Sequence, residues 1–466
     1  MEFIKFYTHV FLIINLVLLS YIVVFAKRRA LDSIYILIVY ALSIGCNYRY
    51  FGFSMGQILM LVVMLFGCFG NFYGLRTDKY ADRGAIKSLV MLYILYMSGV
   101  TIIGYICSVS YKVEGSIIQN EFRPIMQIVQ LIALMFTVLY AMRLKREESL
   151  AVLNIFNKAL LFIAFLGILQ WVLFLVLRID IFPIDREYSG IQYGVSALTS
   201  AGFVRACSCV GEPKQFAKFM CIGISLELFC GKYGEKKHLN IGRLVIYGGC
   251  ILMTASATGV LIAVVAFALY FFMKTERKGL ACIGVFAGIA MLLIALKMPF
   301  VASKIAYHVE RGQIPGLEDC DTTVVRWLIS EPLYGVFGVG MGNTVCYAHD
   351  YIPSREVAYI ANYLFTLRRG LIKYIGEGGI VGIFLILGIF YKFINRAKKD
   401  RNLVYEIVFL VIMNLFLTLE AIEGLQFILM ALISNVAYKP ADIEQVKHYS
   451  HTRYKNRIHL KGSIAV

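Results

Sequence analysis

The sequence predicts an all-α, polytopic integral membrane protein with about 12–14 transmembrane helices. Hydrophobic residues make up 59% of the 466 residues, and charged residues only 16%. Soluble globular proteins are roughly 45–50% apolar and about 25% charged, so no soluble fold would bury this much apolar surface. Apolar runs long enough to cross a bilayer recur along most of the chain. This composition excludes a cytosolic enzyme, a secreted disulfide scaffold and a disordered chain.

The apolar runs define the expected spans. A helix rises 1.5 Å per residue, so about 20 apolar residues cross a hydrocarbon core that is about 30 Å thick. Lipid offers no hydrogen-bond partners, so each run must satisfy its own backbone as a helix. We expect spans at residues 8–26, 31–45, 55–75, 88–108, 124–142, 159–177, 216–230, 243–254, 258–273, 280–297, 371–391, 403–420 and 421–436. Segments 243–273 and 403–436 could each be divided differently.

The cations indicate which way the spans run. The net charge is +17, from 46 Lys and Arg against 29 Asp and Glu. Most of the cations lie in one set of connections, at residues 27–29, 76–87, 143–146, 232–243, 274–278 and 392–401, and in the tail after residue 438. The positive-inside rule makes this set cytoplasmic, with the N-terminus outside and the C-terminus inside. Cations spread in this way do not predict a nucleic-acid partner.

On this topology the chain divides into six parts. They are N-terminal transmembrane helices in 1–177, an outer loop in 178–215, transmembrane helices in 216–297, a large outer loop in 298–370, C-terminal transmembrane helices in 371–436 and a basic cytoplasmic tail in 437–466. The large outer loop is big enough for a small folded element. It also carries acids and bases that the spans lack, so we expect any chemistry to take place there.

The smaller outer loop leads into a helix through a cationic segment. Pro213 suits the first turn of a helix, and the Glu212 carboxylate before it suits the positive end of the helix dipole. Arg205, Lys214 and Lys218 beside a helix N-terminus would bind an anionic group such as phosphate. The alternative is that Arg205 and Lys218 meet lipid headgroups.

Two further features concern the spans and the large loop. The segment 253–259, Met-Thr-Ala-Ser-Ala-Thr-Gly, interrupts two apolar runs and favours a tight turn or packing seam. In the loop, Arg326 lies four residues after Thr322 on a predicted amphipathic helix, ahead of a glycine-rich turn at 338–343. The Arg326 guanidinium suits a phosphate or pyrophosphate, and a solvated surface arginine is the alternative.

The large loop also contains a D-x-D sequence, Asp319-Cys320-Asp321, and two cysteines that could pair, Cys320 and Cys346. D-x-D is too common to predict a metal site, and we expect none. An outer disulfide is compatible with an oxidising compartment. Free thiols are favoured, because most of the other cysteines lie in or near spans as small apolar residues.

The chain re-enters the membrane through a second cationic segment. Arg368, Arg369 and Lys373 lie at the outer face, against the positive-inside trend. Glu377 follows within the start of the next helix, and an ionisable side chain inside a span is a candidate functional residue.

Four of these features occur in an order that resembles the O-antigen polymerase and ligase superfamily (Wzy-type polymerases and the related ligases). These proteins are GT-C-like glycosyltransferases that use polyprenyl-pyrophosphate-linked glycans. The resemblance covers residues of about 200 to 390, and the first 200 residues match only as a run of spans. The matching features are Arg205 with Glu212-Pro213-x-x-Phe216-Ala217, Thr254-x-Ser256-x-Thr258-Gly259, Arg326-Trp327 with the glycine-rich turn, and Glu377-x-Gly-Ile-x-Gly.

The resemblance assigns Arg205 and Arg326 to the pyrophosphate of the donor. Lys214, Arg368 and Arg369 are further candidates for binding the pyrophosphate, because they bring positive charge to the same outer surface. The related ligases have a His, usually followed by Asn, about nine residues before the exit glutamate. Arg368 and Arg369 occupy those positions here, which favours a polymerase.

The same departure leaves the general base unassigned. Glu212, Glu377, His349 and Asp350 are the candidate catalytic residues. The resemblance implies no metal and no cofactor. It also implies an already activated donor, in agreement with the absence of a G-x-x-x-x-G-K-[ST] loop from the sequence.

The resemblance therefore implies a polymerase in the bacterial inner (plasma) membrane. It would join undecaprenyl-pyrophosphate-linked oligosaccharide repeats into O-antigen, capsule or exopolysaccharide on the outer face. Implied partners are membrane lipid and a chain-length regulator and flippase of the same pathway. Two alternatives stay open: a ligase that passes finished glycan to an acceptor, and a transporter or flippase for lipid-linked glycan. Transporters usually show internal repeats, and we find none between the two halves.

Overall fold

The structure is a computed structural model of the whole chain. The residues it describes are 13, 17, 49–50, 53–54, 81–108, 123–179, 181, 199–200, 203–210, 213–233, 239–274, 302, 306, 319–351, 367, 369–417 and 422–437. Apart from residues 13 and 17, the predicted spans at 8–26, 31–45, 55–75 and 280–297 lie outside these residues, as does the basic tail.

The described residues are almost entirely helical. The principal helices are α4 (Ala81–Ser108), α5 (Arg123–Ala141), α6 (Arg146–Leu177), α8 (Pro213–Ser225), α9 (Ile241–Met253), α10 (Ala257–Lys274), α13 (Asp319–Ser330), α17 (Gly370–Ala397), α18 (Arg401–Ile412) and α19 (Ile422–Ala437). Two π-helical segments continue α8 and α18, namely η7 (Leu226–Cys230) and η10 (Met413–Leu417). Two antiparallel hairpins pair β1 (Arg49–Tyr50) with β2 (Phe53–Ser54) and β3 (Thr199–Ser200) with β4 (Phe203–Val204).

Five helices are long and apolar enough to cross a membrane, as expected of a polytopic membrane protein. These segments are Ala85–Ser108, Pro124–Ala141, Arg146–Leu177, Ala257–Lys274 and Gly370–Ala397. They agree with the predicted spans at 88–108, 124–142, 159–177, 258–273 and 371–391. The predicted spans at 216–230, 243–254, 403–420 and 421–436 correspond to shorter helices, two of which are extended by π-helical turns.

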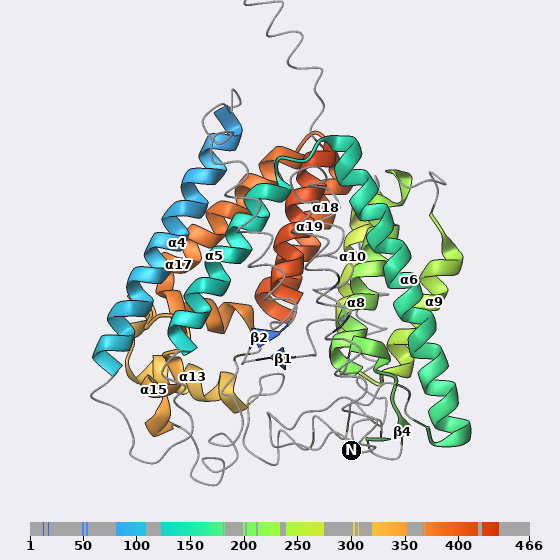
Figure 1. Cartoon of the computed structure of the whole chain (residues 1–466), viewed down its shortest axis with the longest axis horizontal. Coiled ribbons are helices and arrows are strands. Elements are labelled where there is room, and N and C mark those ends of the chain that lie inside the picture. Colours follow the sequence, from blue (N-terminus) through green and yellow to red (C-terminus); the bar gives the residue numbers. More distant parts are fainter. Residues whose placement is uncertain are drawn as a thin grey trace, which may run out of the picture.

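Successive helices run in opposite directions through one bundle (Figure 1). At one end the Arg146 Nε donates to the Val436 carbonyl over 2.9 Å, which joins the start of α6 to the end of α19. We call this the basic end, because the basic connections 143–146 and 397–401 lie there. At the opposite end Arg205 meets the turn between α9 and α10. We call this the loop end, since it carries α13 and the turns before α8 and α17 (Figure 1).

The helix α19 forms the centre of the bundle. Its side chains are buried on all sides, from Leu425 to Val436, which is the pattern of a core helix. By contrast, α4 and α17 expose large apolar side chains outward, including Leu95, Ile103 and Phe384. In a lipid environment such outward apolar faces contact acyl chains.

A chain of buried polar side chains crosses the core between α17, η10 and α19. The Tyr374 hydroxyl donates to Asn414 Oδ1 over 2.8 Å. The Asn414 amide in turn donates to Gln426 Oε1 over 2.8 Å. The two bonds link three side chains in series, and the chain fixes the register of three helices against one another.

We expect the Asn414→Leu variant to be less stable than Tyr374→Phe. Interhelical hydrogen bonds in membranes contribute about 0.6 kcal/mol on average, so removing the Tyr374 hydroxyl should have a small effect. Loss of Asn414 removes two bonds and leaves two buried groups without partners, so we expect a loss of about 1–2 kcal/mol. Thermal unfolding in detergent measures both. The control is Tyr391→Phe on the exposed side of α17, and equal melting temperatures for all three variants would contradict a structural role for the chain.

Candidate functional site

The helix α17 begins at Gly370 and is broken about two and a half turns later, just after Glu377. Gly379 has a φ of +62°, which interrupts the helical backbone. The glycine-rich turn at 338–342 approaches the break and pairs with it. The Val339 N–H donates to the Gly376 carbonyl over 3.1 Å, and the Gly340 N–H donates to the Glu377 carbonyl over 2.8 Å. The sequence predicted the turn and the glutamate, and the break itself is a finding of the structure.

The same turn is also held by α4. The Thr101 hydroxyl accepts from the Met341 N–H over 3.0 Å, and the Asn343 amide donates to the Thr101 carbonyl over 3.0 Å. The Tyr96 hydroxyl donates to the carbonyls of both Phe337 and Gly378. The turn is thus fixed from two sides by hydrogen bonds to backbone groups.

Glu377 lies inside this junction. Its side chain is only 6% exposed, and its Oε1 accepts from the Gly342 N–H at 3.4 Å. Its carboxylate is thereby aimed at the glycine-rich turn, so two features of the family resemblance lie in direct contact. A carboxylate beside backbone N–H groups can act as an acid or base, or can simply hold the turn in place.

Arg369 joins the start of α17 to α13. Its backbone N–H donates to Asp321 Oδ1 over 3.3 Å, and its Nη1 donates to the Phe416 carbonyl over 2.7 Å. Asp321 is fully buried. This aspartate therefore anchors the helix entrance, which accounts for one acid of the D-x-D sequence without a metal. Among the described residues no cluster of three metal-ligating side chains occurs.

The helix α13 is amphipathic, as predicted, and it carries Arg326 outward. Asp321, Val324 and Trp327 are buried, whereas Arg326 is exposed. Asp350 is also exposed, in the short helix η9 (His349–Tyr351), which packs against α13. Cys320 and Cys346 are not joined in a disulfide, in agreement with the favoured prediction.

Arg205 lies at the turn between α9 and α10. Its Nε donates to the Thr254 carbonyl over 2.9 Å, and the adjacent Ala206 N–H donates to the Met253 carbonyl over 3.0 Å. Ala255 has a φ of +47°, which confirms the predicted tight turn. The guanidinium therefore binds the negative end of the α9 dipole, and this contact fixes its position. Two more features of the family resemblance are joined here.

The backbone that carries Arg205 is pinned against α6. Gln170 Oε1 accepts from the N–H groups of Cys207 and Ser208, over 3.0 and 2.6 Å. The Ser208 hydroxyl donates to the Ile163 carbonyl. Burial raises the pKa of the Cys209 thiol to about 11, so this cysteine is neutral at pH 7 and no thiolate nucleophile.

The helix α8 begins at Pro213, as predicted. Lys214 is half-buried in its first turn, and Lys218 one turn later is only 2% exposed. This burial is against the alternative in which Lys218 meets lipid headgroups. Glu212 and Arg368 lie outside the described residues, and so does the side chain of His349.

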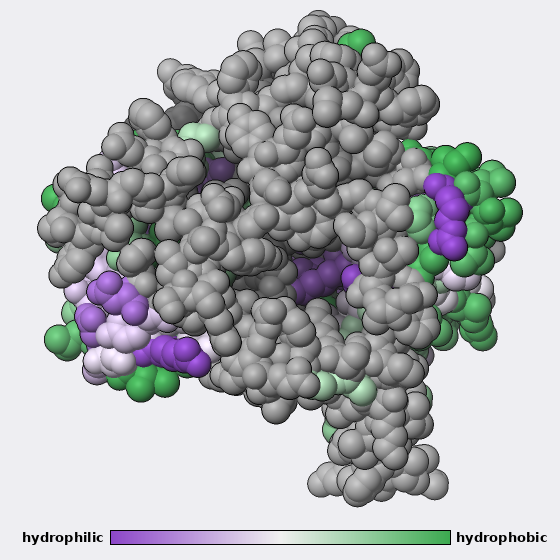
Figure 2. Space-filling view, turned by 90° about the horizontal axis from the view of Figure 1, so that it is seen from below, coloured by the Kyte–Doolittle hydropathy of each residue, from purple (hydrophilic) through white to green (hydrophobic). Residues whose placement is uncertain are grey.

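All the described candidate residues therefore lie at the loop end of the bundle. Figure 2 shows this end, with apolar and hydrophilic side chains together at the flanks and further hydrophilic ones visible near the middle. The structure joins Arg205 to the 253–257 turn and Glu377 to the glycine-rich turn. Asp350 lies at the rim of the second group, beside α13.

The residues that hold these groups in place were not identified from the sequence. Thr101, Tyr96 and Gln170 bind backbone atoms of segments that are distant in the sequence. Their signal was a polar side chain inside an apolar span, which lipid disfavours unless it has a partner. The partners could not be read from the sequence, because each is a backbone group of a segment distant along the chain.

We expect Gly340→Ala to destabilise the junction by more than about 1 kcal/mol. Gly340 has a φ of +84°, and a Cβ there would clash with the Thr101 backbone. The matched control is Gly99→Ala on α4, the helix that the turn contacts. A Cβ at Gly99 would meet nothing within 4 Å. Thermal unfolding in detergent should separate the two. Equal stability would mean that the turn is not docked on α4.

Comparison with known proteins adds no assignment. No protein-family model matches the sequence, and no curated protein is similar to it. The resemblance described above therefore depends on its four short motifs.

Proposed function

We propose that this protein is a membrane glycosyltransferase that polymerises polyprenyl-pyrophosphate-linked oligosaccharide repeats on the outer face of the membrane. The growing chain on its carrier is the donor, and a hydroxyl on a new repeat unit is the acceptor. The hydroxyl attacks the anomeric carbon, the bond to pyrophosphate breaks, and the pyrophosphate-bearing lipid leaves. No cofactor is needed, because the donor is already activated.

One observation carries the proposal: the motifs of the resemblance meet in pairs at one end of the bundle. Arg205 contacts the 253–257 turn, and Glu377 contacts the glycine-rich turn. The two pairs lie at the same end of the bundle (Figure 1), which supports a functional site at this end.

The electrostatics of this end suit a pyrophosphate leaving group. Arginine stays charged and presents a planar set of donors that matches phosphate oxygens. Arg205 is held by backbone contacts, and Arg326 is exposed on α13. Pre-positioned cations stabilise the charge that develops on a leaving group without reorganisation during the reaction. Glu377 is the described candidate base that is buried, and Asp350 is an exposed one.

Deletion of the gene tests the function directly, by the size distribution of surface glycan. Single repeat units at the surface, without a ladder, would support the polymerase. Full-length chains retained on the polyprenyl carrier would indicate the ligase. An unchanged ladder would contradict both enzymes and a flippase for lipid-linked glycan alike.

We expect Arg326→Ala to abolish polymer while the protein stays inserted and stable. The side chain is exposed, so its removal should change stability by less than about 0.5 kcal/mol. The matched control is Arg178→Gln, an exposed arginine that follows α6 at the same end. Gel analysis of surface glycan and immunoblotting of membranes measure the two effects. Normal chains from Arg326→Ala would remove Arg326 from the pyrophosphate site.

Arg205 requires a different substitution, because it also supports the 253–257 turn. We expect Arg205→Lys to retain the positive charge but to lose the planar donor set, and therefore to lower polymer yield at least tenfold. Comparison of its melting temperature with that of the wild type separates loss of function from loss of fold. A stable Arg205→Lys protein with a normal ladder would assign Arg205 to the turn alone.

A further inference from the structure

A cavity of about 70 Å³ lies at the basic end of the bundle, opposite the candidate glycosyltransferase site. The first half of α6, the π-helix η7, the start of α9 and single residues of α18 and α19 line it. Its polar lining comes from Asn154, Asn157, Lys158, Glu227, Asn240 and Arg243. Its apolar lining includes Leu150, Leu153, Leu226, Leu403 and Val436.

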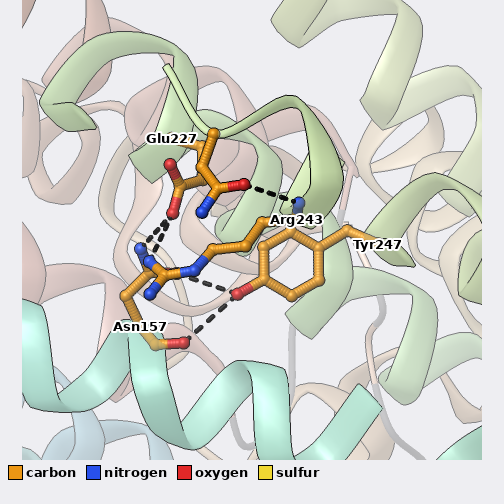
Figure 3. A network of polar contacts seen from close by, with 5 residues as sticks. Asn157, Glu227, Arg243 and Tyr247 are labelled. Atoms are coloured by element: carbon orange, nitrogen blue, oxygen red, sulfur yellow. Dashed lines mark hydrogen bonds and ion pairs between the residues drawn. The ribbon is translucent and has the colours of Figure 1, made fainter. Parts of the chain in front are cut away.

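A network of polar contacts fixes one side of this cavity (Figure 3). The Arg243 Nη1 lies 2.7 Å from Glu227 Oε1, and the Asn157 amide donates to the same oxygen over 2.7 Å. The Tyr247 hydroxyl donates to Asn157 Oδ1 over 2.9 Å. Glu227 is 3% exposed and Arg243 is 25% exposed. Both side chains line the cavity, and the arginine is the more exposed of the two.

The charges of the lining favour an anion. Lys158 and Arg243 bring two positive charges, and Glu227 brings one negative charge that is directed at Arg243 and Asn157. The N-terminus of α9 adds the positive end of a helix dipole. The net charge of the lining is thus +1, which matches a phosphodiester.

The depth of the cavity matches the headgroup layer of the membrane. The helix α6 has 32 residues, so it is about 48 Å long and exceeds the hydrocarbon core of about 30 Å. Its polar residues Asn154, Asn157 and Lys158 all precede the apolar stretch 159–177. Lys158 therefore marks the edge of the apolar layer, where phosphates of membrane lipids lie.

The apolar residues that line the cavity favour an amphiphilic ligand. Leucines on α6 and α18 line the cavity together with the polar groups, so a bound molecule would present a charged part and an apolar part. A free phosphate ion would gain nothing from these leucines, and a lipid would place the start of its acyl chains against them. Basic pockets between helices at the cytoplasmic side of membrane proteins bind lipid headgroups for the same reason.

We propose that this cavity binds the phosphate group of an anionic phospholipid from the leaflet at the basic end, with Lys158 and Arg243 as its cationic contacts. The lipid would join α6, η7 and α9 at the end of the bundle that the glycan does not reach. The proposal is independent of the glycosyltransferase activity.

Purified protein in mild detergent provides the test, with its melting temperature as the readout. Phosphatidylglycerol is the probe, and phosphatidylcholine and inorganic phosphate are the comparisons. We expect phosphatidylglycerol to raise the melting temperature in a saturable manner, and phosphatidylcholine to raise it far less. Stabilisation by inorganic phosphate to the same extent would support a phosphate site with a soluble ligand. No difference between the two lipids, with no effect of phosphate, would overturn the proposal.

Substitutions in the cavity show whether phosphatidylglycerol binds there. We expect Lys158→Gln to weaken the apparent affinity for phosphatidylglycerol about tenfold, since one charge-assisted contact is lost. Lys398→Gln, an exposed lysine at the same end, is the matched control and should bind like the wild type. Arg243→Gln would leave Glu227 buried without its ion pair and could unfold, so Asn154→Leu is the second variant, which fills the cavity. Wild-type affinity in both Lys158→Gln and Asn154→Leu would overturn the proposal.

Discussion

The loop end of this protein depends on backbone hydrogen bonds between the glycine-rich turn and the break in α17. A broken helix in an apolar environment leaves N–H and carbonyl groups without partners, and lipid cannot supply them. The N–H groups of Val339 and Gly340 satisfy the carbonyls of Gly376 and Glu377. Glycine is required at Gly340 and Gly379, because both have positive φ and lie against other backbone. The break is thus stable only while the loop is in place.

This dependence explains how a surface loop can position residues inside a helical bundle. The turn carries α13 with it, and the Arg369 backbone binds Asp321 at the start of that helix. The position of Arg326 is therefore set by α4 and α17, although it lies in the outer loop. Arg205 is positioned by the same principle, through Thr254 on one side and the α6-bound backbone on the other. Arg205 is bound to the end of α9, and Arg326 lies within the helix α13.

The sequence was sufficient to predict the membrane class, the five long spans and the start of α8, because each depends on local composition or on one residue type. The tight turn or packing seam within 253–259 and the amphipathic helix that carries Arg326 were predicted for the same reason. The break in α17 was not predicted. Glycines such as Gly378 and Gly379 are common in transmembrane helices and do not by themselves indicate a break. The network of Asn157, Glu227 and Arg243 was also missed. Asn157 and Glu227 are 70 residues apart in the sequence, and Glu227 and Arg243 are 16 residues apart. No local pattern therefore joins them.

The candidate site itself was predicted in parts. Arg205 and Glu377 were identified from charge at the edge of an apolar run, and Arg326 from its place on a predicted amphipathic helix before a glycine-rich turn. All three lie at one end of the bundle (Figure 1). Their contacts with Thr254 and Gly342 are tertiary, so the sequence could not reveal them. The residues that orient them, Thr101 and Gln170, are uncharged side chains within spans, and their role depends on what lies opposite.

The shortness of α9 has a consequence for the membrane around it. With 13 residues it is about 20 Å long, although the hydrocarbon core is about 30 Å thick. Its start carries Arg243 in the polar network, and its end is bound by Arg205. Polar groups at the two ends are therefore separated by less than a bilayer thickness. Such a mismatch is relieved by local thinning of the bilayer or by shielding from neighbouring helices. Bilayer thickness would then act on both ends of α9 at once, and lipids with longer acyl chains would strain the helix that links the two polar regions.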